Sequence, residues 1–178
     1  MFGLEFIAKL IKILRSEISP NQISAGFILG MMLGLTPFWS LHNLIIILLI
    51  LLLKVNIATA IFSFGIFSAI GYLLDPVFHN LGFYLLVDVK SMHGIWSALY
   101  NFPVIALSKY NNTVVMGSFV MSLVLLLPVF ILVRKGVISY RENIDVKIKE
   151  KMQKWKILQI IKSSKIYSLY QKIKSLGD

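Results

Sequence analysis

Residues 18–53 decide the fold class: they read ISPNQISAGFILGMMLGLTPFWSLHNLIIILLILLL, 36 consecutive residues without Asp, Glu, Lys or Arg. Two further uncharged runs follow, at residues 55–74 and 110–133. About 18 such residues suffice for a helix to cross a hydrocarbon core roughly 30 Å thick. This pattern predicts an all-α, polytopic membrane protein that crosses a bilayer several times.

The overall composition agrees with this interpretation. Hydrophobic residues make up 57% of the 178 residues, charged residues 15%, and the mean hydropathy is +0.80. A soluble domain carries about 25% charged residues, because it needs a hydrated surface. The chain has no cysteine, which excludes disulfides, thiolate nucleophiles and cysteine-ligated metals.

The positive charge gathers at the C-terminal end. Residues 134–178 hold twelve Lys or Arg against four acidic residues. Basic segments stay on the cytoplasmic side of a membrane, and apolar residues recur here at helical spacing. We therefore expect a basic cytoplasmic amphipathic helix that lies on anionic lipid or docks on a partner helix. The predicted contacts with lipid headgroups are Lys147, Lys151, Lys154 and Lys162.

The N-terminal residues 1–16 predict a second amphipathic helix, either at the membrane interface or packed on the rest of the protein. We expect this end to be retained, because no cleavage site follows it. The predicted domains are thus residues 1–16, a transmembrane domain at 17–133, and the basic helix at 134–178. With both ends basic, both termini should be cytoplasmic, which requires an even number of crossings, two or four.

The longest uncharged run is interrupted at Thr36-Pro37. Proline removes a backbone donor and obstructs the preceding helical turn. We therefore expect two short helices, Pro20–Thr36 and Ser40–Leu53, that form a broken hairpin. The hairpin either crosses a thinned bilayer or re-enters from one side. Its turn should be buried in protein, because lipid cannot satisfy non-helical backbone.

Three further segments complete the transmembrane domain. A helix at 57–74 should be stopped by Asp75-Pro76. The short apolar stretches 77–87 and 95–107 predict re-entrant or interfacial segments, because neither is long enough to span. The last predicted span is 113–133.

Gly26, Gly30 and Gly34 repeat every four residues and share one helix face. Such a face lets another backbone approach closely, which is how helices associate within a membrane. One interpretation is ordinary packing inside the protein. The other is close approach to a ligand or to the transmembrane helix of a partner.

No pattern in the chain indicates catalysis. The polar positions Asn56, Asp75 and Pro76 lie at the ends of apolar runs, and a boundary with water accounts for such positions. The other interpretation is a functional role for an ionisable residue at membrane depth, which applies most to Asp75 because apolar stretches flank it on both sides. Glycine-rich phosphate loops, nucleophile elbows and zinc motifs are absent from the sequence. The three histidines lack the spacing of metal ligands. We therefore expect no enzymatic activity, no cofactor, no metal and no nucleic-acid partner.

The hydrophobic body resembles a family of bacterial inner-membrane proteins of unknown function. The resemblance covers residues 15–90 and rests on four loose motifs. These are a proline-led helix with small residues (Pro20, Ala25, Gly26, Gly30), the Thr36-Pro37 turn, Asn56, and the step at Asp75-Pro76, where members usually have Asn-Pro. Some relatives are encoded beside AsmA-like proteins, the periplasm-spanning lipid-transfer bridges. The resemblance implies a role as the inner-membrane partner of such a bridge.

Two hypotheses of function follow. The favoured one is a non-enzymatic inner-membrane subunit that docks a partner's transmembrane helix and assists lipid transport to an AsmA-like bridge. The alternative is a small transporter or channel whose broken helices line the substrate path.

Overall fold

The computed structural model describes residues 18–145, and within this range every regular element is helical. The α-helices are α2 (Pro20–Leu35), α3 (Leu41–Leu52), α4 (Ile57–Phe83), α5 (His93–Tyr100), α6 (Pro103–Ala106) and α7 (Thr113–Ser139). Shorter π and 3-10 segments are η1 (Tyr84–Asp88), η2 (Lys90–Met92) and η3 (Tyr140–Asp145). The all-helical fold class is confirmed.

Within the described residues, two helical stretches are long and apolar enough to cross a membrane, Ile57–Asp88 and Thr113–Asn143. The helix α3 is apolar but shorter. Residues 18–137 belong to one compact unit, and residues 138–145 belong to a second. The predicted helix at 1–16 and the four headgroup lysines lie outside the described residues.

Local sequence explains how the helix α2 begins. The Ser19 hydroxyl accepts a hydrogen bond from the Gln22 amide (3.2 Å), and the Gln22 side chain accepts one from the Ser19 amide (3.1 Å). Pro20 occupies the first helical turn, where its missing N–H costs nothing. The helix starts at the residue that the sequence predicted.

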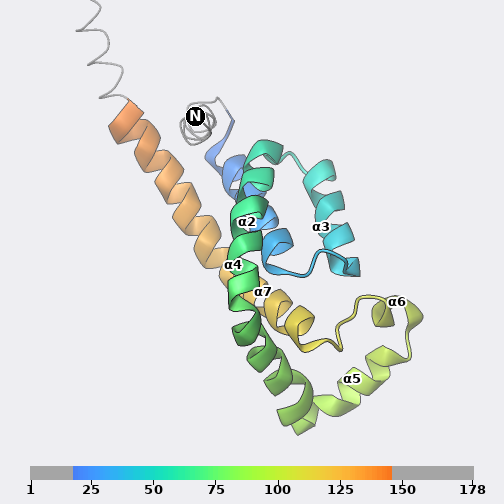
Figure 1. The fold of residues 1–178 in the computed structure, drawn as a ribbon. Helices are drawn as coiled ribbons and strands as arrows, with labels where there is room; N and C mark the ends of the chain where they lie inside the picture. Colours follow the sequence, from blue (N-terminus) through green and yellow to red (C-terminus); the bar gives the residue numbers. More distant parts are fainter. Residues whose placement is uncertain (1–17, 146–178) are drawn as a thin grey trace, which may run out of the picture. The chain divides into compact units, whose positions relative to one another are not determined.

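The helices α2 and α4 lie side by side and run in the same direction, and α3, which connects them in the chain, runs back along one side of the pair (Figure 1). Gly26 faces the Asn56 backbone, and Gly30 faces Ala60. The Asn56 amide donates to the Gln22 carbonyl (3.0 Å), which ties the starts of both helices together.

The helix α7 runs antiparallel to α4. Its start packs on the far end of α4, where Gly82 meets the Thr113 backbone and Gly117 meets the Phe78 carbonyl. At the opposite end, Arg134 reaches Asn21 in the first turn of α2. The helices α2, α4 and α7 thus form a three-helix body (Figure 1).

Two apolar clusters hold this body together. One gathers buried residues of α2, α3 and α4: Leu29, Met32, Leu33, Ile46, Ile50 and Ala60. The other joins the last turns of α2 to the far half of α4, through Met31, Leu35 and the fully buried Phe78. Partly buried side chains of α7 pack against both clusters.

The prediction that Asp75-Pro76 stops a helix is wrong. The helix α4 continues through Pro76 to Phe83, and η1 follows it directly. A break here would uncover the packing of Phe78 and Gly82 on α7, and no capping side chain bonds to the backbone at this step. Continuing the helix therefore costs less than ending it, even without the proline N–H.

Other boundaries also differ from the predicted ones. Residues 77–87 are not a separate re-entrant segment, because they belong to α4 and η1. Residues 95–107 hold most of α5 and the one-turn helix α6. The predicted last span begins at Thr113 as expected, but α7 runs through Pro128 and past Val133 to Ser139.

Candidate functional site

The turn between α2 and α3 has a closed polar network. Thr36 is extended (φ −97°, ψ 147°), the conformation expected before a proline. Its hydroxyl lies 2.8 Å from both the Met32 carbonyl and Asn43 Oδ1, which share its one proton. Asn43 Nδ2 donates to the Pro37 carbonyl (2.9 Å) and to the Phe38 carbonyl (3.3 Å). Together with bonds from the Ser40 hydroxyl to the Pro37 carbonyl and from the Ser40 amide to the Phe38 carbonyl, they satisfy the backbone at the break.

The two side chains at the centre of this network are buried. Asn43 is 1% exposed and Thr36 is 4% exposed, whereas the neighbouring Trp39 is 83% exposed. The turn therefore points its polar groups inward and its aromatic side chain outward. The structure places the break at Thr36-Pro37, as the sequence predicted, but the predicted burial of the turn holds only for Thr36 and Ser40. Pro37, Phe38 and Trp39 are exposed, because the side chains that bond within the fold are those of Thr36, Ser40 and Asn43.

The glycine face of α2 is filled by α4 of the same chain. A methyl group added at Gly26 or Gly30 would overlap the carbonyl of Asn56 or Ala60. At Gly34, an added Cβ would lie 2.8 Å from the Phe64 carbonyl. Gly71 continues the contact from α4, with the Gly34 carbonyl 2.8 Å from its own added Cβ. Ordinary packing thus accounts for this face, and no room is left on it for a partner's helix.

The remaining predicted polar positions do not come together. Asn56 caps α4 by accepting bonds from the Thr59 amide (2.7 Å) and hydroxyl (2.8 Å). Asp75 and Pro76 lie inside α4, the first half-buried and the second exposed. Within residues 18–145, no group of three His, Cys, Asp or Glu side chains could hold a metal ion.

A cavity of about 400 Å³ lies between α3, α5 and α7. We call it the α3–α7 cavity. Its walls include His42 from α3, Trp96 and Leu99 from α5, and Val115, Met116 and Phe119 from α7. The segment before α7 closes another side with Ile105, Ser108 and Tyr110. Most of these side chains are apolar.

Hydrogen bonds within the protein hold the cavity walls in place. Trp96 Nε1 donates to the Leu85 carbonyl (3.0 Å), which fixes α5 against η1. The Tyr110 hydroxyl donates to the Trp96 carbonyl (2.7 Å), and the Ser108 hydroxyl donates to the Ile105 carbonyl (2.6 Å). The polar side-chain atoms of these three wall residues are therefore directed at the protein backbone.

Sequence reasoning missed several of these residues. Asn43 could have been noticed as an isolated amide in an uncharged run, one helical turn beyond the break. Gly71, Gly82 and Gly117 carry no local repeat, because each packs against a segment distant in sequence. The cavity gathers residues between His42 and Val120 and has no sequence signature.

Comparison with known proteins gives two matches. A family profile described as "Uncharacterized protein conserved in bacteria (DUF2062)" matches residues 5–143. A relative from Treponema pallidum (strain Nichols), described as "Uncharacterized protein", is 24% identical over 139 residues, which cover 78% of this chain and 85% of the relative. No solved structure matches the chain. Since the profile covers most of the sequence, the chain belongs to this conserved bacterial family, DUF2062.

Proposed function

We propose that the chain is a non-enzymatic, multi-pass subunit of the bacterial inner membrane that assists lipid transport. In this proposal α4 and α7 cross the bilayer, and the α2–α3 hairpin re-enters from the cytoplasmic side without crossing. Both termini are cytoplasmic. The observation that carries the proposal is the position of the hairpin turn halfway along α4.

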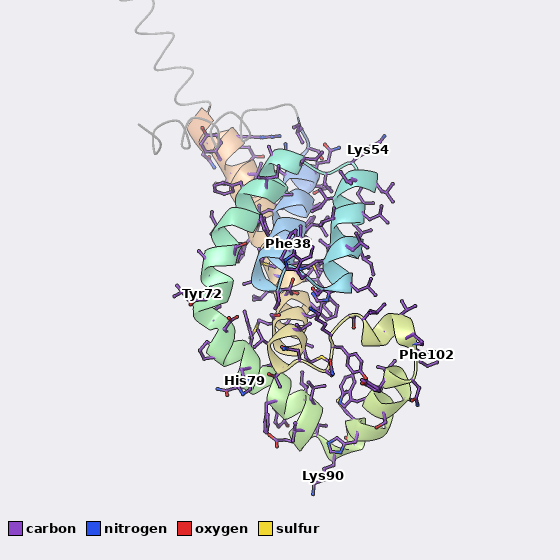
Figure 2. The ribbon with its side chains drawn as sticks, turned by 45° about the vertical axis from the view of Figure 1, so that its right-hand side comes forward. Phe38, Lys54, Tyr72, His79, Lys90 and Phe102 are labelled. Carbon is purple, nitrogen blue, oxygen red and sulfur yellow. The ribbon has the colours of Figure 1, made fainter. Side chains whose placement is uncertain are left out.

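Helix lengths support re-entry over crossing. The 12 residues of α3 rise about 18 Å, well short of a hydrocarbon core of roughly 30 Å. The end of α2 lies beside Gly71, 14 residues or about 21 Å along α4 from Ile57. Figure 2 shows Phe38, in the turn, between Lys54 at one end of the body and Lys90 at the other.

The turn has the properties that a position inside the bilayer requires. Non-helical backbone at membrane depth must be satisfied by protein or water. The Asn43 side chain satisfies the Pro37 and Phe38 carbonyls from within the fold. The exposed Trp39 and the exposed leucines of α3 present an apolar surface of the kind that lipid covers.

Charge supports the orientation. Lys54, Arg134 and Lys135 lie at the end of the body where α2 and α4 begin and α7 leaves. The basic residues of 146–178 follow them along the chain. Lys90 and Lys109 belong to the opposite end, which also holds Asp88. The larger basic content marks the first end as cytoplasmic.

A membrane partner remains part of the proposal, but we place its docking site on α3 instead of on the glycine face of α2. Because α4 fills the glycine face, a partner helix would use the exposed apolar side of α3, at Leu44, Leu48 and Leu52. An AsmA-like bridge is the predicted partner, by the resemblance alone. A photo-reactive residue at Leu48 should crosslink to that bridge in its native host, whereas one at the fully buried Met31 should not.

The alternative, a transporter with broken helices along the substrate path, has less support. Such paths offer unsatisfied backbone or charged groups to the substrate. Here the polar groups of the break are bonded to one another, and Asp75 is not joined to a charged partner among the described residues. We therefore favour the subunit over the transporter.

The absence of cysteine makes the topology directly testable. Variants with a single cysteine in place of Lys54, Trp39 or Lys90 would be treated with a membrane-impermeant maleimide in intact spheroplasts. We expect K90C to react from outside, K54C to react only after permeabilisation, and W39C to react in neither case. Reaction of W39C from outside would show a full crossing, and reaction of K54C from outside would reverse the orientation.

A further inference from the structure

The α3–α7 cavity lacks the polar groups that a hydrated or charged ligand needs. Donors at Trp96, Ser108 and Tyr110 are each directed at a backbone carbonyl. The Ser40 hydroxyl donates to the Pro37 carbonyl (2.8 Å), so His42 Nε2, 3.1 Å from Ser40 Oγ, is the donor in that pair. The wall therefore has no unpaired side-chain donor to offer an anion.

An apolar occupant fits this wall. A buried water needs two to four polar partners, and apolar cavities without such partners stay dry or take up hydrocarbon. A volume of about 400 Å³ lies within the range of pockets that bind small ligands. Leu99, Met116 and Phe119 offer apolar contacts to a flexible hydrocarbon chain of a ligand.

An exposed lysine adjoins two residues of the same cavity wall in the chain. Lys109 is exposed and stands between Ser108 and Tyr110, which both line the wall. Its backbone has φ +58°, the left-handed region that glycine favours, and it is the one described non-glycine residue with positive φ. The ammonium group makes no ion pair with another described residue.

We propose that the α3–α7 cavity binds one acyl chain of an anionic glycerophospholipid, with the lipid phosphate paired to Lys109. The proposal rests on the proposed function, because it needs the cavity to lie within a bilayer. It adds the ligand class and the headgroup contact. With Lys90 and Lys109 at the end opposite to Lys54, Arg134 and Lys135, the lipid comes from the periplasmic leaflet.

Trp96 in the cavity wall provides the test. The other two tryptophans, Trp39 and Trp155, are replaced by phenylalanine, so that fluorescence reports on Trp96 alone. The full chain is placed in nanodiscs of phosphatidylcholine with an increasing fraction of phosphatidylglycerol brominated on its acyl chains. We expect quenching that saturates at a low mole fraction. Brominated phosphatidylcholine in the same series should quench only in proportion to its amount.

Two matched pairs of variants locate the site. V120F fills the cavity and should raise the half-saturating mole fraction about tenfold, whereas V124F, exposed one turn further along α7, should change it less than about twofold. K109Q should reduce the preference for phosphatidylglycerol about fivefold, from the loss of one charge near a lipid surface. K90Q, another exposed lysine of the same end, should leave the preference unchanged.

Several results would overturn the proposal. Linear quenching that is equal for both lipids would show general contact with bilayer lipid. If V120F and V124F changed the half-saturating mole fraction equally, the saturable site would lie outside the α3–α7 cavity. If K109Q kept the preference for phosphatidylglycerol, Lys109 would not contact the lipid headgroup. K109Q remains informative if V120F does not fold. Linear quenching together with the expected cysteine labelling would remove the cavity site and leave the topology standing.

Discussion

Arg134 Nε donates a hydrogen bond of 2.8 Å to Asn21 Oδ1, which joins two residues separated by 113 positions. Asn21 lies in the first turn of α2, and Arg134 lies in the last two turns of α7. The contact places the start of the hairpin and the exit of the last long helix at the same end of the body. An even number of crossings follows if α4 and α7 are the helices that span.

Crosslinking tests this arrangement. In the cysteine-free background, N21C together with R134C should form an intramolecular link with a short bismaleimide, because the two native side chains touch. Mass spectrometry of the digested protein would identify the linked peptides. N21C with K90C serves as the control and should give no link, since Lys90 follows the far end of α4. Equal yields for the two pairs would contradict the arrangement.

The close packing of α2 on α4 makes a prediction about Gly30. In G30A, the new methyl group meets the Ala60 carbonyl, so the helices must separate. We expect a loss of about 1–3 kcal/mol in the free energy of unfolding, as for other overpacked sites. Unfolding by SDS titration from mixed micelles would measure it.

Gly65 gives the matched control on α4. No atom lies within 4 Å of an added Cβ there, so G65A should be neutral or stabilise by about 0.5–1 kcal/mol through helix propensity. A G30A protein as stable as G65A would mean that α2 and α4 are not in backbone contact.

Sequence patterns predicted this packing face because its three glycines repeat within one helix. The same reasoning could not find Gly82 and Gly117, which meet Thr113 and Phe78 across long separations. A repeat identifies a face only when all its members belong to one segment. Contacts between single small residues of two helices depend on the crossing point, which local periodicity does not specify.

The hairpin boundaries were predicted to within one residue, because proline and serine act locally. The continuation of α4 through Asp75-Pro76 was not predicted, because it depends on tertiary packing. At Thr36-Pro37, Asn43 supplies replacement bonds for the opened carbonyls. At Pro76, burial of Phe78 and Gly82 favours a continuous helix. The two prolines look alike in sequence and differ only in their surroundings.

Removing the Asn43 amide should be costly. N43L removes one hydrogen bond each from the Pro37 and Phe38 carbonyls, which keep their bonds from Ser40, and leaves the Met32 carbonyl as the remaining partner of the Thr36 hydroxyl. Each lost hydrogen bond contributes about 0.5–1.5 kcal/mol, so we expect the unfolding free energy to fall by about 1–3 kcal/mol. T36V removes only one hydroxyl and should cost about 1 kcal/mol.

The double variant shows whether the two residues act together. Since Thr36 and Asn43 bond directly, the losses in N43L and T36V should not add, and a double-mutant cycle should give a coupling of about 0.5–3 kcal/mol. Strict additivity would contradict a shared network at the turn.

Pro76 and Pro37 should respond to alanine in opposite directions. P76A restores an N–H inside α4 and removes the ring's clash with the preceding turn. Because a proline in a helix interior costs up to about 3 kcal/mol, we expect P76A to raise the unfolding free energy by about 1–3 kcal/mol. Pro37 lies outside the helices, where it restricts the unfolded chain. P37A should therefore lower the unfolding free energy by about 0.4–1 kcal/mol. A loss of stability in P76A, measured by the same SDS titration, would mean that the helix ends at Asp75.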